Sequence, residues 1–364
     1  MSYRFLLPRS LLALMIAASL QGQPSNQPAK PAPAKAAAKS KTWTLPRTPD
    51  GHPDLQGVWT NATITRMERL PEFNGKLNLT EAEAAKFEKG DHEAAEEKPG
   101  VESVNLGGAV FSGANAGYNV LFIDRGSELA RVDGVKRSSL IVDPPDGKVP
   151  PRAQAQGGAG AGRGGAGRGG AAAGGGRAGA AGGRGFGGQY DSVKNRPVSE
   201  RCLVGFGSTS GPPMMPVLYN NNYEIVQTPD AVMILVEMVH DVRVIRMNAT
   251  HDPPEVRKWL GDSIGTWEGD TLVVDTTNFN GQTRFRGSSE NLHVIERFTR
   301  ADANSILYRV TIDDPSVFSK QWTMEYPFAA TPGPVYEYAC HEGNYAMTDI
   351  LGGARKTEAE ATKK

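Results

Sequence analysis

The sequence predicts a mostly β domain in which an antiparallel meander closes into a barrel, with a short helix before it. Segments rich in Val, Ile and Thr follow one another after residue 220, and the connections between them are short and turn-like. Within residues 305–313 apolar and polar side chains alternate, which is the pattern of a half-buried antiparallel strand. A meander of about eight strands exposes two edges unless it closes, so we expect a barrel, with an open β-sandwich as the alternative.

The part of the chain before the barrel is less regular. Thr80 and Glu83 have the spacing of a capping box, which predicts a helix that runs to about Glu97. The segment "SSLIVDPPDGKVPP" predicts a short strand that ends in a turn at residues 144–147.

The barrel strands are predicted from their composition and turns. Residues 231–247 are long enough for a helix, but their β-branched content favours strands that bend near His240 and Asp241. A tight turn at residues 268–270 joins the two strands of a hairpin. The other strands are expected at residues 223–227, 293–299, 305–313 and 321–328.

The first residues predict a signal peptide. Arg4 and Arg9 precede the apolar run of residues 10–20, and polar residues follow it. The run is about half as long as a membrane-spanning helix requires, so we expect no membrane span in the mature protein. The sequence therefore predicts a signal peptide at residues 1–23 and a periplasmic or secreted protein.

Composition divides the rest of the chain. Residues 24–42 are rich in Pro, Ala and Lys and predict an extended tether. Residues 152–188 are almost wholly Gly, Ala and Arg and predict a disordered insertion. Its Arg-Gly-Gly steps are typical of RNA-binding segments, but export and the single aromatic residue Phe186 favour a plain surface loop. We expect the N-terminal part of the domain at residues 43–151, the barrel core at 189–355 and a polar tail at 356–364.

Charge and cysteine content limit the partners and the compartment. Basic and acidic residues both number 40, so no overall charge favours nucleic acid, and we expect a small organic ligand or substrate instead. Cys202 and Cys340 are the only cysteines. In an oxidising compartment they are expected to form a disulfide, the alternative being two buried thiols.

Several ionisable residues interrupt predicted strands, where each is costly unless it is paired or functional. Glu237 breaks an apolar run and is followed closely by His240, while Asp275 lies within "TLVVDTTNF" and His293 within "NLHVIERF". We predict that these four residues face a common interior cavity as catalytic groups. Ligand contacts are predicted for Arg243, Arg297, His341 and Glu342.

These residues also have structural interpretations. Glu237 and Arg243 could form an internal ion pair, and a lone histidine on a strand is more often a core or rim residue than a base. His341 and Glu342 directly follow Cys340, whose disulfide would by itself account for an ordered turn there. The sequence contains no His-Glu-x-x-His or Cys-x-x-Cys spacing and no Gly-x-Ser-x-Gly elbow, so we expect neither a metal nor a cofactor.

Two resemblances add to these predictions. Gly57, Val58 and Trp59 resemble the Gly-x-Trp of the first lipocalin strand, which implies a lipocalin-like or calycin-like barrel. The blocks "PDGHPDLQGVWTN", "SLIVDPPDGKVPP", "WLGDSIGTWEGDTLVVDTTNFN", "RGSSENLHVIERFTR" and "YEYACHEGNY" resemble a family of uncharacterised exported bacterial proteins. That resemblance implies export, and it carries over no activity and no catalytic residue.

The sequence supports three functions from different classes. The leading hypothesis is an exported barrel that binds a small organic molecule in its interior. The alternative is a cofactor-free hydrolase, hydratase or isomerase that uses carboxylate and histidine side chains for general acid–base catalysis. A third is an envelope interaction module, which would need an exposed apolar patch.

Overall fold

The computed structural model describes residues 43–95, 103–106, 109–112, 123–153, 190, 192–205, 211–283 and 285–362. The predicted signal peptide and tether lie outside the described residues, as does the predicted insertion from residue 154 onward. No helix in the described ranges is long and apolar enough to cross a bilayer.

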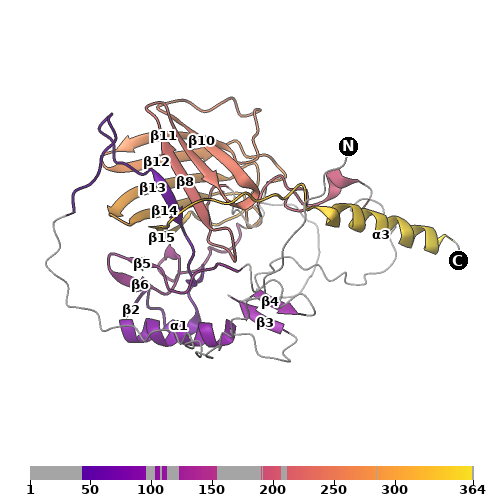
Figure 1. Cartoon of the computed structure of the whole chain (residues 1–364), viewed down its shortest axis with the longest axis horizontal. Coiled ribbons are helices and arrows are strands. Elements are labelled where there is room, and N and C mark those ends of the chain that lie inside the picture. The colour runs from indigo at the N-terminus through magenta and orange to yellow at the C-terminus, as the bar shows by residue number, and fades with distance from the viewer. Residues whose placement is uncertain are drawn as a thin grey trace, which may run out of the picture. The chain divides into compact units, whose positions relative to one another are not determined.

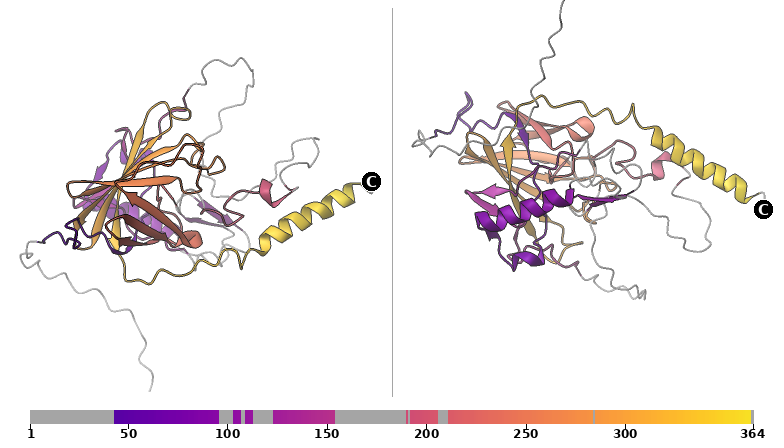
Figure 2. Two further views of the ribbon diagram at one scale, coloured as in Figure 1. Left: turned by 90° about the horizontal axis from the view of Figure 1, so that it is seen from above. Right: turned by 60° about the horizontal axis from the view of Figure 1, so that its bottom comes forward.

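Nine strands form a closed, mixed β-barrel (Figures 1 and 2). In order around the barrel they are β1 (Gly57–Thr60), β8 (Asn222–Gln227), β9 (Ala231–Val236), β10 (Asp241–Met247), β11 (Asp262–Glu268), β12 (Thr271–Thr277), β13 (His293–Asp302), β14 (Ser305–Asp313) and β15 (Trp322–Ala330). Pairing of Trp59 with Ala330 closes the ring, and β7 (Ile141–Asp143) adds to β15 outside it. The predicted barrel is therefore confirmed, and the sandwich alternative is not adopted.

One strand pair departs from the predicted antiparallel meander. β10 and β11 pair in parallel, with Ile245 opposite Ser263. A parallel neighbour requires the chain to return to the end at which the first strand began, and residues 248–261 make this return. Residues 248–261 have no helical pattern that would indicate a crossover, so the sequence was predicted to continue as an antiparallel meander.

The interior of the barrel is filled by alternate residues of each strand. The predicted face of β14 is confirmed, because Ile306, Tyr308, Val310 and Ile312 are all fully buried. Each such apolar side chain contributes about 1.5–3 kcal/mol to folding. Trp59 is also buried, its indole nitrogen donates to the carbonyl of Leu55 over 2.9 Å, and the guanidinium of Arg300 lies 4.6 Å above its ring.

Smaller elements precede the barrel. Helix α1 (Glu81–Ala95) begins at the predicted capping box, in which the backbone nitrogen of Thr80 donates to Glu83 over 2.9 Å. A three-stranded sheet consists of β2 (Asn78–Leu79), β5 (Arg131–Val132) and β6 (Val135–Arg137), and β3 (Ser103–Leu106) pairs with β4 (Ala109–Ser112). A second apolar core, separate from that of the barrel, contains Ile64, Phe73, Leu79, Ala84 and Leu129.

The C-terminal region contains one predicted and one unexpected feature. Cys202 and Cys340 form the predicted disulfide, with their Cα atoms 5.8 Å apart. Beyond it, residues Tyr345–Ala361 form helix α3, where the sequence predicted the end of the barrel core and a polar tail. Gly352 and Gly353 lie inside this helix and lower its propensity, which explains why it was not predicted.

Candidate functional site

The strand register places the four predicted catalytic residues at one end of the barrel. Glu237 follows the last residue of β9 and His240 precedes β10, while Asp275 lies near the end of β12 and His293 begins β13. Antiparallel pairing of these neighbours, and parallel pairing of β10 with β11, bring all of these strand ends together. We call this end of the barrel the Glu237 end.

The four residues share an end of the barrel but not a face, so the predicted common interior cavity is wrong. Glu237 is 3% exposed and accepts hydrogen bonds from the side chain and backbone nitrogens of Asn222, at 2.8 and 3.3 Å. His240 is exposed. Asp275 and His293 alternate with buried residues on their strands and therefore lie on the outer wall.

The structural alternative, an ion pair between Glu237 and Arg243, does not hold because Arg243 pairs with another carboxylate. Arg243 points inward from β10 and forms two hydrogen bonds with Glu296 of β13, at 2.7 and 3.0 Å. Both side chains are almost fully buried, at 1% and 0% exposure. Burial alone would lower the pKa of Arg243, but the Glu296 carboxylate outweighs it and raises the pKa. The sequence did not show this pairing, because Val242 and Val244 alternate with Arg243 and the partner Glu296 is 53 residues away.

The other three predicted ligand-binding residues do not lie in the barrel interior with Arg243. Arg297 lies on the outer wall and forms an ion pair with Glu268. His341 and Glu342 are exposed in the turn that follows Cys340.

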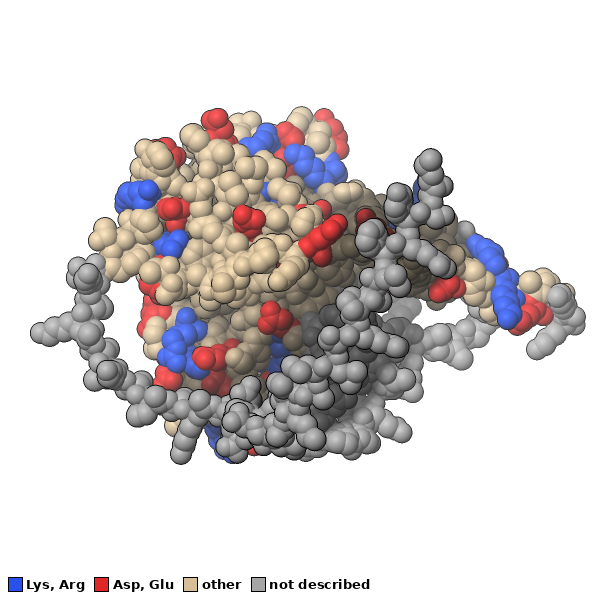
Figure 3. Space-filling model, viewed as in Figure 1, with Lys and Arg blue, Asp and Glu red and all other residues tan. Residues whose placement is uncertain are grey.

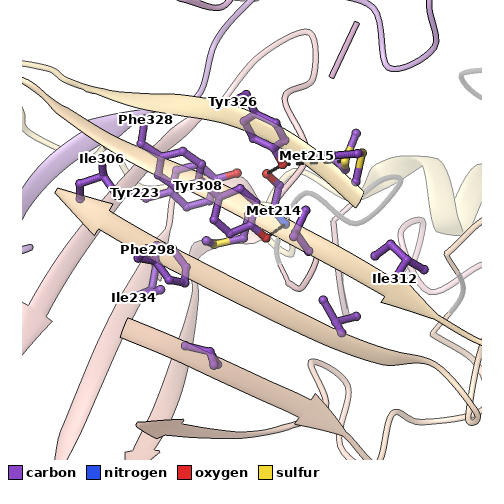
Figure 4. Close-up of a cluster of buried hydrophobic side chains, with 14 of the residues drawn as sticks. Met214, Met215, Tyr223, Ile234, Phe298, Ile306, Tyr308, Ile312, Tyr326 and Phe328 are labelled. Atoms are coloured by element: carbon purple, nitrogen blue, oxygen red, sulfur yellow. Dashed lines mark hydrogen bonds between the residues drawn. The ribbon is translucent and has the colours of Figure 1, made fainter. Parts of the chain in front are cut away.

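A non-strand segment, residues 211–216, reaches the barrel interior at Met214; we call it the Met214 segment. It leads into β8, whose first residue lies towards the Glu237 end. The side chain of Met214 is fully buried and Met215 is 8% exposed. Figure 4 shows both beside Tyr308 and Tyr326, within the cluster of rings from the barrel wall.

Three side chains of the barrel and its flanks bind the backbone of Met214. Its carbonyl accepts hydrogen bonds from Asn61 Nδ2 at 2.8 Å and from the Tyr326 hydroxyl at 2.7 Å. Its N–H donates to the Tyr308 hydroxyl over 3.2 Å, and that hydroxyl donates in turn to Glu296 over 2.8 Å. Burial raises the pKa values of Tyr308 and Tyr326, so both hydroxyls keep their protons.

Several buried polar atoms of this interior have no hydrogen-bond partner among the described residues. They include Oδ1 of Asn61 and Nε of Arg243, whose residues are 1% and 2% exposed. An unsatisfied buried donor or acceptor costs about 1–3 kcal/mol. The Met214 segment therefore satisfies only part of the polar surface around it.

On the outer wall at the Glu237 end, two histidines share one carboxylate. His251 Nε2 and His293 Nε2 lie 3.1 and 3.0 Å from the same oxygen, Oδ1 of Asp275. Partial burial would raise the pKa of Asp275, but the two histidines outweigh it and lower the pKa. The hydrogen bond to Asp275 raises the pKa of His293 above its ordinary 6.5, although partial burial opposes this.

His251 lies in the crossover between β10 and β11 and contacts Asp262 at the start of β11. Its Nδ1 lies 3.1 Å from Asp262, which also accepts from Lys258 at 2.6 Å and from Arg246 at 2.9 Å. Burial would raise the pKa of Asp262, but Lys258, the backbone N–H of Asp252 and His251 hold it well below its ordinary value. Sequence reasoning missed His251 because it lies in an irregular loop with no periodicity.

The outer surface bears on nucleic-acid binding and on the envelope interaction module. Acidic and basic side chains are interspersed on the face shown in Figure 3, which offers no basic patch there for nucleic acid. Val226, Val242 and Val244 are 39%, 52% and 52% exposed on the outer face of β8 and β10. Met233 of β9 pairs with both Val226 and Val244, so the three valines belong to one apolar area.

No family model, no curated protein and no solved structure matches this chain. The geometry of the barrel interior and of its outer wall is therefore the basis for assigning a function.

Proposed function

We propose that the protein binds a small organic molecule inside its barrel, in the position occupied by the Met214 segment. One observation carries the proposal: three side chains around the interior hold the backbone of a segment that is not part of the wall. A ligand inside a barrel is held in the same way, by apolar walls and by a few polar groups at fixed positions.

The surroundings of Met214 support this proposal. Tyr308 lies 5.0 Å from both Phe298 and Phe328 and 5.2 Å from Tyr326, measured between ring centroids. Aromatic walls with hydroxyl groups bind an apolar body and orient its polar end. Methionine is unbranched and adaptable, so the space it fills can accept apolar groups of other shapes.

Binding requires the Met214 segment to withdraw, and this requirement gives a test. The fluorescent probe N-phenyl-1-naphthylamine is titrated into the wild-type protein and into a variant with Met214→Gly and Met215→Gly. The variant loses the apolar contacts that hold the segment in place, so we expect it to bind the probe at least tenfold more tightly.

A cavity in another core provides the control. Leu79→Ala removes a buried side chain from the second apolar core, and this variant is expected to bind the probe as the wild type does. Equal probe affinity in all three proteins would show surface binding and would contradict the proposal.

A second candidate function is general-base catalysis on the outer wall, favoured by the contact of Asp275 with His293 and His251. In this function His293 is the base and Asp275 positions it. Hydrolysis of p-nitrophenyl acetate should then rise with pH as His293 loses its proton, with a midpoint above 6.5 because its pKa is raised.

Removal of the carboxylate tests this candidate. Asp275→Asn should move the midpoint of the pH–rate profile downward, because the group that raises the pKa of His293 is gone. His240→Ala, at an exposed histidine of the same barrel end, should leave the profile unchanged. Full activity in His293→Ala, or a midpoint that Asp275→Asn does not move, would exclude the candidate.

We also propose that the protein is exported and is periplasmic or secreted, as a member of the uncharacterised exported family that it resembles. The Cys202–Cys340 disulfide supports this, because such bonds persist in oxidising compartments.

A further inference from the structure

Asn61 has hydrogen-bonding capacity that the Met214 segment does not use. Its Nδ2 donates to the Met214 carbonyl at 2.8 Å and approaches the Tyr223 hydroxyl at 3.2 Å. Its Oδ1 is buried and has no hydrogen-bond partner among the described residues. Buried acceptors in folded proteins are nearly always satisfied, so this atom indicates a donor that the Met214 segment lacks.

The positions of Asn61 and Tyr326 define the polar group that would donate to Asn61 Oδ1. Asn61 Nδ2 and the Tyr326 hydroxyl converge on one carbonyl position. The unused acceptor belongs to the same planar amide as the first donor, and one of the two N–H bonds of that donor is directed to the same side as the acceptor. A ligand group that bonds to both donors and to Asn61 Oδ1 must carry a carbonyl oxygen and an N–H on the same side. A primary carboxamide or a lactam does so.

The buried Arg243–Glu296 pair offers no free charge to an ionised ligand. The Arg243 guanidinium is matched by two hydrogen bonds to the Glu296 carboxylate, and both are buried. A carboxylate or ammonium group on the ligand would add a buried charge with no free counter-charge at this pair. The remaining surroundings of Met214 are aromatic and aliphatic.

We propose that the ligand of the barrel interior is a neutral primary carboxamide or lactam with an apolar body. Its carbonyl replaces that of Met214 between Asn61 and Tyr326, and its N–H donates to Asn61 Oδ1. This inference rests on the proposed function, because it identifies the ligand class of the same site.

The test compares three small probes by ligand-observed NMR titration. They are ε-caprolactam, N-methyl-ε-caprolactam, which lacks the N–H, and hexanoate, which is charged. In the wild-type protein we expect ε-caprolactam to bind at least tenfold more tightly than its N-methyl analogue, and hexanoate not to bind. The cost of displacing the Met214 segment is common to all probes, so the ratio should be the same in the Met214→Gly, Met215→Gly variant.

Substitution of Asn61 shows whether the preference for the lactam comes from its hydrogen bond to Asn61 or from the size of the N-methyl group. In Asn61→Leu the preference for the lactam should vanish, since no acceptor remains for its N–H. A preference that persists in Asn61→Leu would come from the bulk of the methyl group and would overturn the inference. Asn61→Ala provides the same comparison if the leucine variant does not fold.

The outcomes distinguish the inference from the proposed function. If ε-caprolactam binds no better than its N-methyl analogue, or fails to bind while N-phenyl-1-naphthylamine binds, the ligand class is wrong and the interior site stands. If none of the probes binds either protein, the proposed function itself is wrong.

Discussion

Glu296→Gln is expected to destabilise the protein by about 3–5 kcal/mol, because it leaves the Arg243 guanidinium buried without its carboxylate. Both side chains are at most 1% exposed, so water cannot replace the lost partner. The Tyr308 hydroxyl also loses a charged acceptor. The free energy of unfolding from urea denaturation measures the effect, provided that the slope of the transition is unchanged.

Two further variants control this prediction. Glu268→Gln breaks the exposed pair with Arg297, whose side chains are 58% and 39% exposed, and should cost less than about 1 kcal/mol. Arg243→Met combined with Glu296→Leu removes both buried charges and should recover at least half of the lost stability. A cost below about 1 kcal/mol for Glu296→Gln would mean that water reaches the pair, and would contradict its burial in the barrel.

Replacing Cys202 and Cys340 by Ser is expected to cost about 2–5 kcal/mol. The bond closes a loop across 138 positions of sequence, and a loop of this length restricts the unfolded chain strongly. A reductant should lower the thermal midpoint of the wild type toward that of the double variant and leave the variant unchanged. Equal midpoints for oxidised wild type and variant would show that the disulfide does not stabilise the barrel.

Local composition, turns and alternation were enough to predict the strands, and the exposed edges of so long a meander predicted that it closes. The inward set on β14, from Ile306 to Ile312, could be read residue by residue, since a strand repeats every two residues. The capping box of α1 was equally local. The parallel pairing of β10 with β11 could not be read, because residues 248–261 give no helical signal for a crossover.

The site was less predictable because its contacts join residues far apart in the chain. Arg243 alternates with Val242 and Val244, which are the exposed residues of β10, so the sequence showed neither that Arg243 points inward nor that it meets Glu296. Parity places Asp275 and His293 on one face, and they do meet at 3.0 Å, yet on the outer wall. Nothing in "GPPMMP" indicates that Met214 enters the barrel, since such a segment has no periodicity.

The central claim, that a ligand takes the place of the Met214 segment, is tested most directly by hydrogen exchange of the Met214 amide. That N–H donates to the Tyr308 hydroxyl in the buried interior, so it should exchange slowly in the free protein. With saturating N-phenyl-1-naphthylamine, we predict that the Met214 amide exchanges at least tenfold faster while amides of β12 are unchanged. Full protection of Met214 in the presence of bound probe would contradict the claim.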